Sequence, residues 1–272
     1  MEILVPILIL FGIGVVAALL LTVTAAYFGV KDDERAAEIR EALPGANCGA
    51  CGFSGCDEYA KALSQGKTDK ANLCVPGGDG TASEIAAIIG VEAGDVIERV
   101  AYVSCNGSCS PDERKYEYDG PKTCEAAKMY FSGDRMCTYA CLGYGDCMKV
   151  CPRDAICIGE NGVANIDPRR CIGCGLCIRT CPSKIIYLVN DTSRIVVKCS
   201  SHSKGAVVRR SCKNGCIACG KCEKVCPSDA IHVIDNLATI DYEKCTACGK
   251  CVEACPVQCI HEGNFICGAH FE

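Results

Sequence analysis

The sequence predicts an α+β chain made of an N-terminal transmembrane helix, a small mostly helical domain and two tandem copies of one cysteine-rich module. Three observations carry this prediction: residues 3–30 bear no charge, residues 31–99 are acidic, and the cysteine pattern of residues 141–156 recurs at residues 216–231. The chain has 28 Cys among 272 residues, only 6 Phe and no Trp. A core so poor in aromatic side chains needs cross-links or bound metal to be stable.

Residues 1–30 are expected to form a transmembrane anchor. The uncharged run over residues 3–30 exceeds the roughly 20 residues that a helix needs to cross a bilayer. No basic segment precedes it and it is too long for a signal-peptide core, which favours an anchor over a cleaved signal peptide. Basic residues follow it at Lys31, Arg35 and Arg40, and they place the rest of the chain in the cytoplasm. Thiols stay reduced there, so the cysteines are better interpreted as metal ligands than as disulfides.

Residues 31–99 are expected to form the small, mostly helical domain. A helix over residues 32–43 ends at Pro44, and Ser83 caps a second helix over residues 84–89, which ends at Gly90. Four cysteines lie on loops between them, at Cys48, Cys51, Cys56 and Cys74. The formal net charge of the whole chain is −5, which argues against a nucleic-acid partner.

Residues 100–272 contain one unit twice. We expect a cysteine-bearing linker segment over residues 100–136, a first module over 137–198 and a second module over 199–272. In each module a cysteine run ends in Cys-Pro, and two apolar stretches around a turn with Gly or Asn follow it. This pattern is typical of a small β-hairpin.

The cysteine spacing predicts four-iron clusters. A cubane iron–sulfur cluster needs four thiolate ligands. Three cysteines spaced every third residue can wrap one side of the cluster. The fourth cysteine of such a run binds the neighbouring cluster in two-cluster proteins. Zinc sites use two Cys-x2-Cys pairs, so zinc is the weaker alternative. The pattern Cys-x2-Cys-x2-Cys-x3-Cys-Pro is complete at Cys171, Cys174, Cys177 and Cys181, at Cys216, Cys219, Cys222 and Cys226, and at Cys245, Cys248, Cys251 and Cys255.

These runs resemble bacterial two-cluster ferredoxins, over about residues 137–190 and 212–262. In the second module the resemblance implies the ligand sets Cys216, Cys219, Cys222, Cys255 and Cys245, Cys248, Cys251, Cys226. In the first module it implies the set Cys151, Cys171, Cys174, Cys177. The other cluster of the first module departs from the pattern, because Tyr144 stands where the second module has Cys219. Cys137, the nearest upstream thiol, is the candidate to join Cys141, Cys147 and Cys181, and a three-iron cluster is the alternative.

Two further groups of cysteines lie outside this pattern. In residues 48–56 glycines let the backbone approach a cluster and donate N–H groups to its sulfurs. We therefore expect a fifth [4Fe-4S] cluster at Cys48, Cys51, Cys56 and Cys74, with a glycine-rich zinc loop as the alternative. A sixth cluster is left open, with inert buried thiols as the alternative. Its ligands would come from Cys105, Cys109, Cys124, Cys137, Cys199 and Cys212.

Four features follow one another along the chain: an apolar N-terminal span, an acidic helix, the stretch Gly-Ala-Asn-Cys-Gly-Ala-Cys-Gly-Phe-Ser-Gly-Cys over residues 45–56, and ferredoxin modules. Together they resemble the B subunits of Rnf complexes, over essentially the whole chain. The resemblance implies the electron-entry subunit of a membrane-bound ferredoxin:NAD oxidoreductase that transports Na+ or H+. It implies partnership with soluble reduced ferredoxin and with the other subunits, at the cytoplasmic face of the cell membrane. The chain shows no acid–base or nucleophilic constellation, so no complete active site is expected in it.

Two other classes of function stay open at this point. One is a polyferredoxin subunit of another membrane oxidoreductase, hydrogenase or quinone-linked, and the other is zinc binding or metal storage. A basic segment favours a ferredoxin partner, because soluble ferredoxins are acidic as a class and charge complementarity steers encounter. This basic segment covers residues 194–224, where Glu223 is the single acidic residue. Its basic residues are Arg194, Lys198, Lys204, Arg209, Arg210, Lys213, Lys221 and Lys224.

Overall fold

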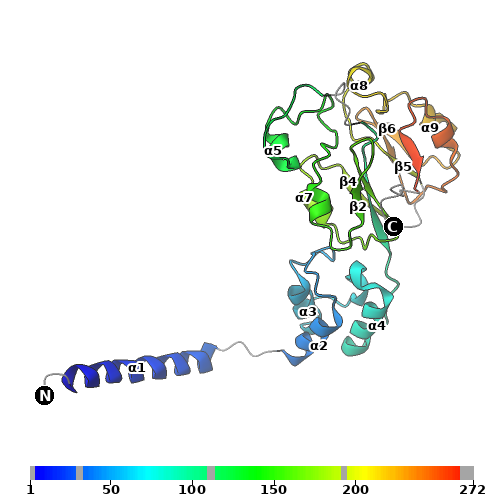
Figure 1. Cartoon of the computed structure of the whole chain (residues 1–272). Helices are drawn as coiled ribbons and strands as arrows, with labels where there is room; N and C mark the ends of the chain where they lie inside the picture. The colour runs from blue at the N-terminus through cyan, green and yellow to red at the C-terminus, as the bar shows by residue number, and fades with distance from the viewer. Residues whose placement is uncertain (1–3, 29–32, 109–113, 191–194, 264–272) are drawn as a thin grey trace.

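The N-terminal helix stands apart from the folded modules in the computed structural model, which describes residues 4–28, 33–108, 114–190 and 195–263. Helix α1 (Leu4–Phe28) projects away from them (Figure 1). Apolar side chains along it, such as Phe11, Leu19 and Leu21, are exposed. Within the described residues no helix combines the length and the apolar character required of a membrane span.

The small acidic domain is helical, as predicted. Its elements are α2 (Glu34–Ala42), α3 (Cys56–Ser64), the short 3-10 turns η1 (Ala71–Leu73) and η2 (Val75–Gly77), and α4 (Gly78–Ile89). Asp33 caps α2, its carboxylate accepting a hydrogen bond from the Ala36 N–H at 3.4 Å. The three helices bury Ile39, Tyr59 and Ile85, each no more than 1% exposed, so these side chains form the core between them.

Helix α3 was not predicted, and it places Cys56 at the start of a helix rather than on a loop. The second predicted helix corresponds to α4 and is longer than predicted. It begins at Gly78, and Ser83 lies inside it, donating its hydroxyl to the Asp79 carbonyl at 2.8 Å, rather than capping it. Gly78 and Gly80 lower intrinsic helix propensity, but packing of the buried Ile85 against the domain core outweighs that cost. The predicted stop at Gly90 is confirmed, with Gly90 in the left-handed conformation at φ 77°.

The first cysteine-rich module is a pair of two-stranded antiparallel sheets joined by short helices. Strands β2 (Ile156–Ile158) and β3 (Ala164–Ile166) form the predicted hairpin, in which Ile156 pairs with Ile166. Strand β1 (Arg99–Val103) pairs with β4 (Ile186–Asn190), so the segment expected to be a linker contributes a strand to the module's sheet. The helices are α5 (Cys124–Met129), α6 (Asp146–Lys149) and α7 (Leu176–Thr180).

The second module repeats this arrangement. Strands β6 (Ile231–Ile234) and β7 (Leu237–Ile240) form its hairpin, and β5 (Ile195–Val197) pairs with β8 (Ile260–Glu262). Its helices are α8 (Gly205–Ser211), α9 (Lys221–Val225) and α10 (Lys250–Glu253). In both modules the first strand therefore pairs with the last one, and the hairpin lies between them in sequence.

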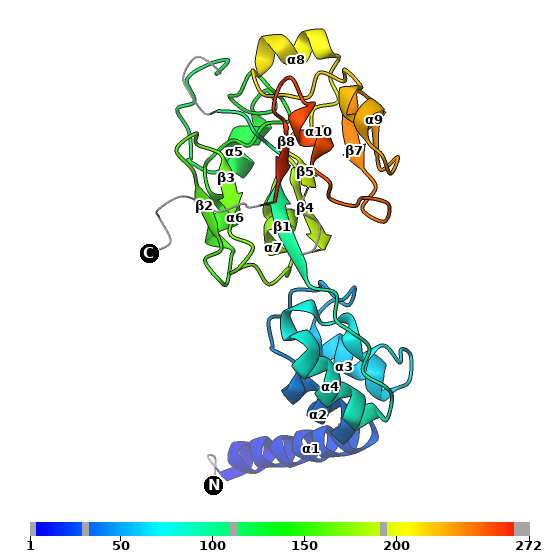
Figure 2. The same ribbon diagram turned by 90° about the vertical axis from the view of Figure 1, so that its right-hand side faces the viewer.

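The two modules contact each other side by side, and the helical domain lies at one end of the first (Figure 2). The buried Ser104 hydroxyl lies 2.8 Å from the Val197 and Cys199 carbonyls, and the Ser200 hydroxyl donates to the Ser104 carbonyl at 2.9 Å. The helical domain is joined to the first module by Arg179, whose guanidinium donates to the Cys48 carbonyl. Cysteine-bearing loops thus meet at both junctions.

Candidate metal centres

Four cysteine loops share one backbone shape. In each loop two residues have positive φ, and a short helix begins directly after the second of them. In each loop the third cysteine position, for example Cys177, falls in the first turn of that helix. The paired left-handed residues are Gly143 and Gly145, Gly173 and Gly175, Ala218 and Gly220, and Ala247 and Gly249. The loop with Tyr144 therefore keeps the geometry of the others.

Backbone N–H groups point at the sulfurs of the Cys-Pro cysteines. The Ala155 N–H donates to Cys151 Sγ at 3.3 Å, and the Ala230 N–H donates to Cys226 Sγ at 3.3 Å. The N–H of Cys259 does the same to Cys255 Sγ at 3.4 Å. Such bonds stabilise a thiolate and tune the potential of a cluster bound to it, so these sulfurs are placed as the chemistry of cluster ligands requires.

A cavity of about 320 Å³ in the second module brings one predicted ligand set together. Its lining includes the four cysteines Cys226, Cys245, Cys248 and Cys251. Ile231 and Ile240 also line it, so the site is largely apolar. Four thiols that line one space fit the four-thiolate ligand set of a four-iron cluster.

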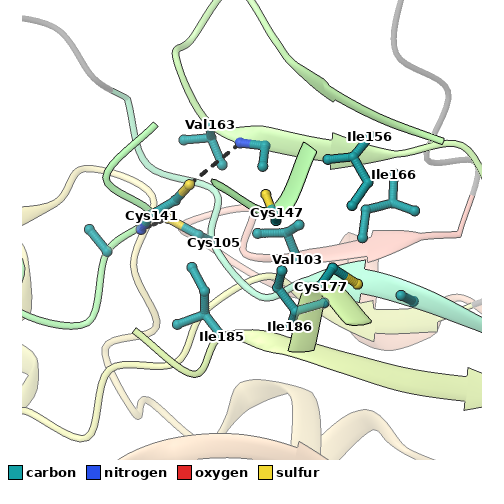
Figure 3. Packing of buried hydrophobic residues seen from close by; sticks show 13 residues of the cluster. Val103, Cys105, Cys141, Cys147, Ile156, Val163, Ile166, Cys177, Ile185 and Ile186 are labelled. Carbon is teal, nitrogen blue, oxygen red and sulfur yellow. Dashed lines mark hydrogen bonds between the residues drawn. The ribbon is translucent and has the colours of Figure 1, made fainter. Parts of the chain in front are cut away.

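A cavity of about 350 Å³ in the first module contains the incomplete set and supplies its fourth thiol. Cys141, Cys147 and Cys181 line it together with Cys124, which sequence reasoning had placed elsewhere. Figure 3 shows Cys141 and Cys147 among apolar side chains such as Val103. The Ala164 N–H donates a hydrogen bond to Cys141 Sγ at 3.5 Å. Cys137, the expected fourth ligand of this set, lines a different cavity.

The first residue of α5 is Cys124, and α6 holds it in place. The Glu125 N–H donates to the carboxylate of Asp146 at 3.1 Å. Burial raises the pKa of the Cys124 thiol, while the backbone N–H groups of Asp146 and Tyr144 act to lower it. The Tyr144 side chain turns away, and its hydroxyl lies 3.1 Å from the fully buried carboxylate of Asp134. No sequence pattern pairs Cys124 with this loop, since only the packing of α5 brings it there.

The other predicted sets are grouped by their mutual electrostatic effects. Burial, followed by the neighbouring thiols Cys171, Cys174, Cys147 and Cys151, raises the pKa of Cys177 to about 12. Burial raises the pKa of Cys222 to about 11, and the nearby thiols of Cys216 and Cys219 act in the same direction. In the helical domain burial raises the pKa of Cys74 to about 11, with Cys56, Cys48 and Cys51 adding to the effect. These effects therefore group all four members of two predicted sets, and Cys216, Cys219 and Cys222 of the third.

A third cavity, of about 450 Å³, lies between the two modules, among cysteines that the sequence left open for a sixth cluster. Four cysteines line it, namely Cys105, Cys137, Cys199 and Cys212. A signal for it was present, since Cys124 and Cys137 are spaced like Cys199 and Cys212. Cys109, another candidate for a sixth cluster, lies outside the described residues.

A single-ion site is a separate question from a cluster site. Among the described residues, no group of three or more His, Cys, Asp or Glu side chains is arranged to hold one metal ion. Each iron of a cubane is bound by its own thiolate, so cluster ligands surround a volume rather than one point. The cysteine-lined cavities have this arrangement.

Family comparisons assign the same three parts of the chain to iron–sulfur domains. Residues 43–76 match a family model for a putative Fe-S cluster. Residues 140–185 and 170–230 match one 4Fe-4S dicluster model, and residues 206–261 match a second. With the fold and the thiol groups described above, these matches define an iron–sulfur electron-transfer protein built from ferredoxin-type dicluster domains.

Curated relatives narrow this class. The chain is 44% identical over 242 residues to the B subunit of the Na(+)-translocating ferredoxin:NAD(+) oxidoreductase complex of Acetobacterium woodii, covering 89% of this chain and 72% of the relative. It is 41% identical to the proton-translocating counterpart of Clostridium ljungdahlii, covering 84% and 81%. It is 38% identical to the B subunit of the ion-translocating oxidoreductase complex of Methanosarcina acetivorans, covering 87% and 89%.

The chain belongs to the family of Rnf complex B subunits. It is an iron–sulfur electron-transfer subunit of an ion-translocating ferredoxin:NAD oxidoreductase. Two of the relatives are named for different coupling ions, Na+ and H+, so their names do not fix the ion for this chain.

Proposed function

We propose that this subunit accepts electrons one at a time from reduced ferredoxin and relays them through at least five [4Fe-4S] clusters to the other subunits. The observation that supports this relay most strongly is that groups of thiols occur in both ferredoxin modules and in the helical domain. The loops that bear these thiols contact one another. The proposed ligand sets are Cys48, Cys51, Cys56, Cys74; Cys151, Cys171, Cys174, Cys177; Cys124, Cys141, Cys147, Cys181; Cys216, Cys219, Cys222, Cys255; and Cys226, Cys245, Cys248, Cys251.

The helical domain is the proposed exit, and its junction with the first module supports this. Arg179 follows Cys177 on α7 and donates to the carbonyl of Cys48, a proposed ligand in the helical domain. The thiol of Cys48 is close enough to Cys174 to contribute to the raised pKa of the Cys174 thiol, which burial dominates. Ligand-bearing loops of two clusters therefore touch, and an electron leaving the first module has the helical domain as its neighbour.

The second module is the proposed entry. Of its basic segment, Arg194 lies outside the described residues and Lys198 is half-buried, whereas most of the other side chains are exposed. Arg209 and Arg210 lie in the last turn of α8, and Lys221 and Lys224 lie on α9 beside Cys222. An exposed cationic surface next to a cluster ligand suits an acidic ferredoxin.

Charge reversal tests the docking surface. We expect Arg209→Glu combined with Arg210→Glu to slow reduction of the complex by ferredoxin and to flatten its salt dependence. Asp229→Lys, at an acid of the same module whose carboxylate is 80% exposed, is the matched control and should not slow it. An unchanged rate and salt dependence in the double variant would remove the docking proposal.

The N-terminal helix is proposed as a single-pass anchor in the cytoplasmic membrane, with the iron–sulfur domains on the cytoplasmic side. Its support is the uncharged run over residues 3–30 and the exposed apolar side chains of α1. Removal of residues 1–30 should release the chain from membranes without lowering its iron content. A truncated chain that stays membrane-bound in the absence of the other subunits would count against the anchor.

Iron and acid-labile sulfide in the anaerobically purified chain test the relay itself. Five clusters predict about 20 Fe per chain, and six predict about 24. Reduction of these clusters by ferredoxin should appear as loss of visible absorbance and as EPR signals of reduced cubanes. Bound zinc with almost no iron would refute the relay and favour metal storage.

A further inference from the structure

We propose that the cavity between the two modules is a sixth cluster site, held by Cys105, Cys137, Cys199 and Cys212, and that it joins the modules into one electron path. This inference rests on the proposed relay. The cavity of about 450 Å³ is no smaller than those of about 350 and 320 Å³ in the modules, and like each of them it is lined by four cysteines.

Both modules contribute ligands to this site. Cys105 follows β1 and Cys199 follows β5, so the corresponding strands of the two modules each lead into the cavity. Cys212 ends α8, and Cys137 precedes the loop that begins at Cys141. Ser104 hydrogen-bonds the Cys199 carbonyl at 2.8 Å, which fixes the two sides relative to each other.

The sulfurs of this site are bonded to ligands of the neighbouring clusters. The Cys141 N–H donates to Cys105 Sγ at 3.4 Å, and the Cys216 N–H donates to Cys199 Sγ at 3.3 Å. Cys141 is a proposed ligand in the first module and Cys216 in the second. A single N–H···S bond therefore separates this site from a ligand residue on each side.

The charges around the cavity fit an anionic group. Arg135, 2% exposed, and the half-buried Lys198 both line it. An oxidised cubane with four thiolates carries about −2, and these two cations beside it would offset part of that charge.

The electron balance of the step is simple. A cubane bound here would accept one electron from the reduced cubane of one module and give the same electron to the oxidised cubane of the other, with no bond or proton changed. Without it, the clusters of the two modules are separated by the whole cavity. The bridging site therefore converts two separate ferredoxin modules into one relay.

Iron content and EPR of the full-length chain test the site. Cys212→Ser is expected to lower iron from about 24 to about 20 per chain and to remove one reduced-cubane signal. Combining it with Cys105→Ser should cause no further loss, because both residues hold the same cluster. The matched control is Ser211→Ala, at a serine that lines the same cavity and should keep the wild-type iron content.

Removal of one charge tests the site without removing a ligand. Lys198→Met should keep all the iron and lower the midpoint potential of one cluster, because a nearby cation stabilises the added electron. Lys204→Met, at a lysine outside the cavity, should leave every potential unchanged.

Three results would overturn the inference: wild-type iron in Cys212→Ser, zinc in place of iron at this site, or unchanged potentials in Lys198→Met. An iron-free wild-type chain would instead overturn the relay.

Discussion

Replacement of Cys124 tests how the first module completes its second cluster. Cys124 lies with Cys141, Cys147 and Cys181 around one cavity, while Cys137 lies in another. We expect Cys124→Ser to lower the iron content by about four per chain, or by about one if a three-iron cluster survives. Metal analysis and EPR of the oxidised protein distinguish these results, because a three-iron cluster is paramagnetic when oxidised.

Pairs of substitutions identify which cysteines share a cluster. Replacing two ligands of one cluster should remove no more iron than replacing one of them, whereas the iron losses from replacing ligands of different clusters should add. Cys124→Ser with Cys141→Ser is therefore expected to remove about four Fe, and Cys124→Ser with Cys105→Ser about eight. Our reasoning is refuted if Cys124 and Cys141 prove additive, or if Cys137 and Cys141 prove non-additive.

The loop geometry also predicts a rescue. Gly143 and Gly145 keep the left-handed pair seen in the complete loops, so Tyr144→Cys should place a thiol where the second module has Cys219. In the Cys124→Ser background this change should restore about four Fe. It removes the Tyr144 hydroxyl from the buried carboxylate of Asp134, at a cost of about 1–3 kcal/mol, so the rescued protein should unfold at a lower temperature than the wild type.

Three further predictions concern the framework around the clusters. Gly173→Ala would place a Cβ 2.5 Å from the Arg99 carbonyl oxygen, so this variant should lose iron. Gly175→Ala has open space around its Cβ, so it should lower the free energy of unfolding by only about 1–2 kcal/mol and keep its iron. Equal iron contents in the two variants would contradict this prediction. Ile85→Ala, at a fully buried site, should destabilise the helical domain by about 2–5 kcal/mol in denaturant unfolding, and a loss below about 1 kcal/mol would show that the site is not packed. Ser104→Ala should cost about 1–3 kcal/mol and increase hydrogen exchange at the contact between the modules; unchanged exchange there would contradict this prediction.

The sequence identified the local features of this protein because short-range chemistry determines them. The cysteine loops, the hairpin of β2 and β3, and helix α2 with its cap at Asp33 each depend on residues close together in the chain. The spacing of a cysteine run determines the shape of its loop wherever the loop is placed. Even the substitution of Tyr144 left that shape intact.

The features that were missed depend on contacts between distant residues. Strand β1 looked like part of a linker because its partner, β4, follows the whole first module. Spacing could not assign Cys124 and Cys137. Cys137 is nearer to Cys141 in the sequence, but Cys124 lines the cavity with Cys141 and Cys137 lines the cavity between the modules. The start of α4 at Gly78 shows tertiary packing outweighing weak local propensity.

The pairing of first with last strands has a consequence for biosynthesis. Strands β1 and β4 of the first module are both available once the chain has been made to Asn190, whereas β5 has no partner until β8, ending at Glu262, leaves the ribosome. The first module can therefore close and receive iron while the second is still being translated. The second module would then fold against a preformed surface presented by Ser104.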